Sequence, residues 1–173
     1  MNSIWKLFYK VLGAINLIFG LTILYKLFEF YTGTISLMEK MNNQNEFDKV
    51  DYSFFDLNFQ FQAKILIGIF YLASGLLILL NKKLGWVLAY SCWIMSILIL
   101  IPMTIYGIQD VTMTTIGEDY WFQIYSGIAL ATSITFLIFL SSKKVRDLNQ
   151  ITLNSFLWSF ALVLILNLPT ILK

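Results

Sequence analysis

The chain contains no histidine and only one cysteine, Cys92. Without histidine it cannot form a bis-histidine haem site or use an imidazole for acid–base catalysis. A single cysteine permits neither an intrachain disulfide nor a multi-cysteine metal site, so Cys92 is expected to be a small packing residue. We therefore expect no metal and no cofactor.

Charged residues are also scarce. They make up 13% of the 173 residues, against about 25% in soluble domains, while 58% are hydrophobic. The net charge of +2 is too small and too scattered to indicate nucleic-acid binding. The composition predicts an all-α, polytopic helical membrane protein that forms one membrane domain over residues 1–173, with the lipid bilayer as its surroundings.

Five apolar runs are long enough to cross a hydrocarbon core of roughly 30 Å as helices. They cover residues 4–28, 63–80, 84–106, 121–140 and 151–172. The first run is also compatible with a signal peptide, but residues 25–30 include none of the small side chains that a cleavage site needs, so we interpret it as an uncleaved helix. The alternative to five crossings is four, with the last segment as a surface or re-entrant helix.

Short basic segments predict the orientation. Lys82 and Lys83 lie between the second and third runs, and Lys143, Lys144 and Arg146 lie between the fourth and fifth. Because cytoplasmic loops are enriched in lysine and arginine, the N-terminus is predicted to be cytoplasmic and residues 29–62 and 107–120 to form extracytoplasmic loops. One arginine among many lysines, isoleucines and asparagines is typical of an AT-rich genome. This favours a bacterium or an organelle, and a bacterial inner (plasma) membrane as the location.

The predicted loop 29–62 carries six acids and two lysines. Residues 55–62 alternate apolar and polar side chains, which fits a strand, an interfacial segment or an irregular start of the second helix. We favour the interfacial segment over a strand, because an isolated strand is unstable. Residues 35–41 have the spacing of a short amphipathic helix.

No ionisable side chain lies deep in a predicted crossing, which excludes the usual machinery of a proton-coupled pump, a voltage sensor or an intramembrane aspartyl protease. The most polar side chain at depth is Asn16, whose amide must find a partner and is the best candidate to line a contact or a cavity. The loop acids Asp110, Glu118 and Asp119 are expected to be solvated rather than to bind a cation.

Glycines recur seven residues apart in the first two runs, as Gly13 with Gly20 and Gly68 with Gly75. This spacing places each pair on one side of its helix, where small residues let two backbones approach closely. The pattern predicts that these helices pack through the four glycines, against each other or a partner subunit, while Leu77 faces lipid. Trp5, Trp86 and Trp121 fit an interfacial belt, and Trp93 and Trp158 are expected to pack inside the bundle.

Packing motifs are present and catalytic motifs are absent, so the leading hypothesis is a non-enzymatic membrane protein that acts by association. It would be an accessory subunit, an assembly factor or an immunity-type protein, with a membrane-protein partner or a second copy as the bound species. One alternative is a small solute transporter or channel that uses the mildly polar faces around Asn16. The other is an enzyme that modifies lipid at the outer surface.

Overall fold

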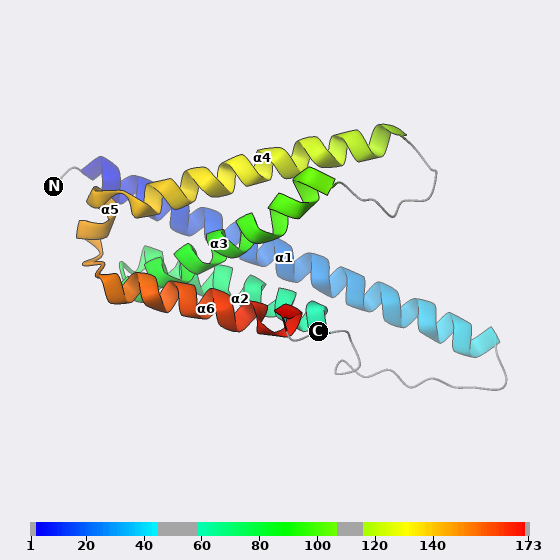
Figure 1. Cartoon of the computed structure of the whole chain (residues 1–173). Coiled ribbons are helices and arrows are strands. Elements are labelled where there is room, and N and C mark those ends of the chain that lie inside the picture. Colours follow the sequence, from blue (N-terminus) through cyan, green and yellow to red (C-terminus); the bar gives the residue numbers. More distant parts are fainter. Residues whose placement is uncertain (1–2, 45–58, 107–115, 172–173) are drawn as a thin grey trace.

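The computed structural model describes the backbone of residues 3–44, 59–106 and 116–171, and the side chains of residues 4–36, 64–101, 104–105 and 124–165. Over these residues the chain is all-α, as predicted (Figure 1). Three stretches are long and apolar enough to cross a membrane, Ile4–Ser36, Lys83–Ile101 and Ile124–Ser141, and they indicate an integral membrane protein. The described helices are α1 (Ser3–Gln44), α2 (Phe59–Leu79), α3 (Lys83–Tyr106), α4 (Ile116–Ser141), α5 (Lys143–Leu148) and α6 (Leu153–Ile171).

α1 is much longer than predicted, because it continues without a break through Gln44. The segment 29–44, expected as the first part of a loop, is therefore helical. It contains no proline, and an isolated glycine such as Gly33 costs a helix only about 1 kcal/mol. An ion pair between Lys26 and Glu29, 2.7 Å apart and one turn along the same helix, adds local support.

Both predicted loops, 29–62 and 107–120, are also shorter than expected at their C-terminal ends. Residues 59–62 begin α2, so the helix-start interpretation of the alternating segment is correct for them, while residues 55–58 lie outside the described residues. Residues 116–120 belong to α4. The polar tract after α4 contains the short helix α5, which buries Val145 against the bundle.

Left-handed residues end two of the helices. Asn81 and Gln150 have φ values of 54° and 51°. The amide of Lys82 donates to the carbonyl of Leu77 at 2.8 Å, and that of Ile151 donates to Arg146 at 2.9 Å. These are the six-to-one bonds of a Schellman motif, which satisfies carbonyls that the helix end would leave free. The first of these turns makes α2 and α3 a tight hairpin.

α3 is the central helix and packs against α2, α4 and α6. Its Trp86 is fully buried, stacks on Tyr90 with ring centroids 4.7 Å apart, and donates its Nε1–H to the carbonyl of Leu140 at 3.0 Å. The interfacial depth predicted for Trp86 stays a prediction, but its side chain packs inside the bundle, whereas the buried position predicted for Trp158 is wrong, because that side chain is 68% exposed. When every face of a helix is apolar, the sequence does not show which face meets protein.

α1 and α4 lie close together at one end of the bundle and diverge toward the other (Figure 1). At the closed end, near α5, the ring of Trp5 in α1 stacks on Phe139 in α4 with centroids 5.7 Å apart. Lys144 of α5 lies over the same Trp5 ring at 4.8 Å from its centroid. The divergence beyond this contact leaves space between α1 and α4.

Candidate functional site

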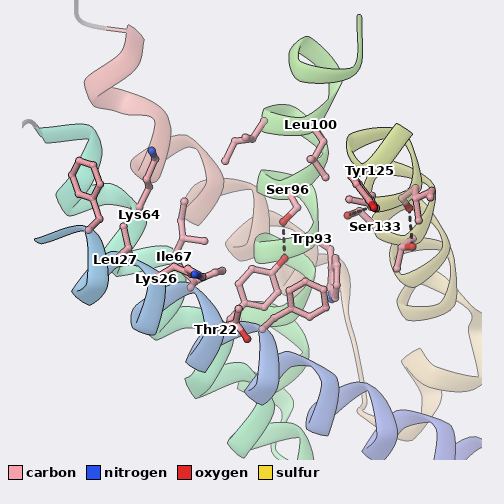
Figure 2. Close-up of a pocket in the computed structure, with 18 residues that line it drawn as sticks. Thr22, Lys26, Leu27, Lys64, Ile67, Trp93, Ser96, Leu100, Tyr125 and Ser133 are labelled. Carbon is pink, nitrogen blue, oxygen red and sulfur yellow. Dashed lines mark hydrogen bonds between the residues drawn. The ribbon is translucent and has the colours of Figure 1, made fainter. Parts of the chain in front are cut away.

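The space between the diverging helices forms a cavity of about 800 Å³. It lies between the middle parts of α1, α2 and α4 and the middle and later part of α3, away from α5 and the N-terminus (Figure 2). Its walls are mainly apolar, with side chains such as Ile23, Leu27, Ile67, Ile99, Leu100 and Ile128.

Aromatic side chains close the cavity near the middle of the bundle. Trp93 of α3 meets Phe19 of α1 and Tyr71 of α2 edge to face, at centroid distances of 5.7 and 5.4 Å. On its other side Trp93 contacts Phe136 of α4 at 4.8 Å. Aromatic pairs at such distances add stability beyond the burial of their area. This cluster joins all four helices and forms the floor of the cavity.

The hydroxyl groups along the cavity are engaged within the protein. Tyr71 and Ser96 share a hydrogen bond of 2.6 Å, visible in Figure 2. Thr22, Thr132 and Ser133 each donate to the carbonyl four residues earlier in their own helix, at 2.8 Å. None of these five hydroxyls is hydrogen-bonded to a side chain that could act as a base.

Two lysines line the end of the cavity opposite the aromatic floor, Lys26 on α1 and Lys64 on α2. The Lys26 amine is paired with Glu29, whereas Lys64 makes no ion pair with any side chain that the structure describes. No pattern in the sequence assigned either lysine to a site. The sequence does contain one indication: Lys26 lies toward the end of the first apolar run and Lys64 at the start of the second, so antiparallel packing of the two helices brings both lysines to the same end.

The four predicted packing glycines lie together at the contact between α1 and α2. A Cβ atom built on Gly75 would lie 2.6 Å from the carbonyl oxygen of Gly13, and one on Gly20 would lie 2.9 Å from that of Gly68. These distances are too short for any larger residue without movement of the backbone. Leu77, expected to face lipid, is only partly exposed and its Cβ packs on Gly85.

Asn16 lies at the same contact and is fully buried. Its Nδ2 donates to Ser74 Oγ at 3.0 Å, and that hydroxyl donates to the carbonyl of Tyr71 at 2.8 Å. Asn16 therefore links α1 to α2 and is not among the cavity residues. Its amide NH2 group supplies an interhelical hydrogen bond.

Among the side chains that the structure describes, no group of three or more acids, cysteines or histidines could hold a metal ion. Cys92 is buried. Asp110, Glu118 and Asp119 lie outside the described side chains. Comparisons with protein-family models, curated proteins and solved structures found no match for this chain.

Proposed function

We propose that this chain is a small multi-pass membrane protein that acts by associating with another membrane component and not by catalysis. Five crossings and a cytoplasmic N-terminus in a bacterial inner membrane are part of the proposal. α2 and α6, with 21 and 19 residues, rise about 31 and 28 Å, close to the thickness of a hydrocarbon core.

The observation that carries the proposal is the cavity between α1 and α4. It is lined by helices that diverge toward one end, so its side faces the bilayer rather than water in the proposed orientation (Figure 1). Its volume of about 800 Å³ falls in the range of roughly 300–1,000 Å³ typical of ligand sites. An apolar cavity open to lipid suits a bound species that is itself dissolved in the membrane.

The other two functions receive less support. A polar solute needs hydrogen-bonding groups along its path, but the hydroxyls of Thr22, Thr132 and Ser133 are bonded to their own helices. A lipid-modifying enzyme would use the acids of the outer loops, such as Asp110, Glu118 and Asp119, and because these three lie outside the described side chains, no described contact supports that function. Association requires only shape and apolar contact, which the cavity supplies.

Site-specific photo-crosslinking in membranes tests the proposal. A benzophenone amino acid replaces Ile128, which lines the cavity, and in a second variant Ile138, an exposed residue of the same helix outside it. We expect one defined protein or lipid adduct at position 128, identified by mass spectrometry, and a mixture with the average membrane composition at position 138. The same mixture at both positions would contradict association through the cavity.

A further inference from the structure

We infer, resting on the proposed function, that the cavity binds one acyl chain of an anionic lipid from the outer leaflet, with the lipid phosphate held by Lys26 and Lys64. Three features of the cavity favour such a lipid: the level of the lysines, their charge, and the extent of the apolar walls.

The two lysines lie at the same level of the bundle. Ile23 and Leu24 of α1 pack directly on Gly68 of α2, so in this antiparallel pair Lys26 lies close in height to Lys64, one turn before Gly68. At 1.5 Å per residue α1 rises about 24 Å from Lys10 to Lys26. With their long stems extended toward the headgroups, both amines reach the depth of lipid phosphates.

Among the described side chains, the charge at this level is positive and only partly compensated. Lys26 is bonded to Glu29, with Nζ 2.7 Å from Oε2, and both side chains are more than half exposed. Lys64 has no carboxylate partner among the described side chains. An ammonium that has no carboxylate partner among the described side chains, next to an apolar cavity, complements a ligand that joins a negative headgroup to a hydrocarbon tail.

The extent of the cavity favours a lipid chain over a partner helix. The walls run from the lysines to the aromatic floor, seven residues from Lys64 to Tyr71, which is about 10 Å of helix and fits within one leaflet. A crossing helix is about 10 Å wide and would need a groove along the whole bundle. The stacking of Trp5 on Phe139 closes α1 onto α4 in the other half.

Native mass spectrometry of the purified full-length protein tests this inference. The protein is titrated with phosphatidylglycerol and, separately, with phosphatidylcholine that carries the same acyl chains. We expect one phosphatidylglycerol to bind in preference to phosphatidylcholine. In Lys64→Gln the preference should fall roughly fivefold, and further in the Lys26→Gln/Lys64→Gln double variant. Lys82→Gln, an exposed lysine of the α2–α3 turn, is the matched control and should retain the preference.

Two further measurements separate the lipid chain from its headgroup. Ala129→Phe narrows the cavity without touching either lysine and should reduce binding of both lipids, with a melting midpoint recorded to verify folding. Soluble glycerol phosphate should not displace the lipid, because it has no chain to fill the cavity. Displacement by glycerol phosphate would overturn the inference in favour of a free phosphate site.

The remaining outcomes distinguish the inference from the proposed function. The phosphate inference would be overturned if both lipids bound equally and the lysine variants had no effect. A protein adduct from position 128 would overturn it as well. In both cases the proposed association through the cavity would stand. If position 128 gives only the average membrane mixture and neither lipid binds, association through the cavity fails as well.

Discussion

At the scale of single residues, close contact between α1 and α2 depends on the absence of side chains. Gly20 and Gly75 face backbone atoms of the partner helix at distances that leave no room for a Cβ atom, and a Cβ on Gly13 or Gly68 would displace a side chain of that helix. In a bilayer apolar surface gains little from leaving lipid, so helix association depends on van der Waals contact and interhelical hydrogen bonds. The hydrogen bond between Asn16 and Ser74 lies at this contact and is one such interhelical hydrogen bond.

Alanine at Gly75 should therefore destabilise the protein, whereas alanine at Gly33 should not. The new Cβ at position 75 would meet the carbonyl oxygen of Gly13 at 2.6 Å, while nothing lies within 4 Å at position 33. We expect Gly75→Ala to cost roughly 1–3 kcal/mol through overpacking, and Gly33→Ala to be neutral or stabilising by up to about 1 kcal/mol. Thermal melting in detergent measures both, and equal midpoints would show that the close approach does not contribute.

At the scale of elements, the connection between α2 and α3 depends on one left-handed residue, Asn81. Asparagine adopts this conformation more readily than most residues, and a β-branched side chain adopts it poorly. The turn matters because it sets α3 antiparallel to α2 and so places Trp93 and Ser96 opposite Tyr71.

Asn81→Val should lower the free energy of unfolding by roughly 1–2 kcal/mol, since valine would be held at a φ near 54°. Asn81→Gly also lacks the side-chain amide of asparagine, but glycine tolerates the left-handed conformation. The melting midpoint of this variant should therefore remain close to that of the wild type. The difference between the melting midpoints of the two variants measures the cost of the left-handed backbone conformation at position 81. If valine is tolerated as well as glycine, the left-handed cap is not required for the hairpin.

At the scale of the whole molecule, the proposed topology determines which leaflet supplies the ligand. Reporter fusions after Asn45 and Thr114 should behave as extracytoplasmic, and fusions after Lys83 and Arg146 as cytoplasmic, because basic residues concentrate in the two short connections at the α5 end. An inverted pattern would contradict the orientation and move the cavity to the inner leaflet.

A fusion at Lys173 tests the number of crossings. An extracytoplasmic signal is expected for five crossings, since an odd number places the two ends on opposite sides. A cytoplasmic signal at Lys173 alone would make α6 a surface or re-entrant helix and reduce the number to four.

The sequence by itself determined the helical class and the approximate positions of the long apolar helices, because hydropathy averaged over a helix is a local property. The spacing of the four glycines was also readable, since residues seven apart in a helix share a face regardless of what they meet. Neither property depends on which helices become neighbours.

Only the tertiary structure decided the neighbours and the cavity. Trp86 and Trp158 occupy equally apolar helices, yet one is fully buried and the other is exposed. The continuation of α1 through Gln44 replaced part of a predicted loop. Lys26 and Lys64, far apart in sequence, line one cavity because α1 packs on α2 at Gly68 while α4 diverges from α1. The physical reason is that hydropathy separates lipid-soluble from water-soluble segments, whereas contacts between apolar helices depend on shape.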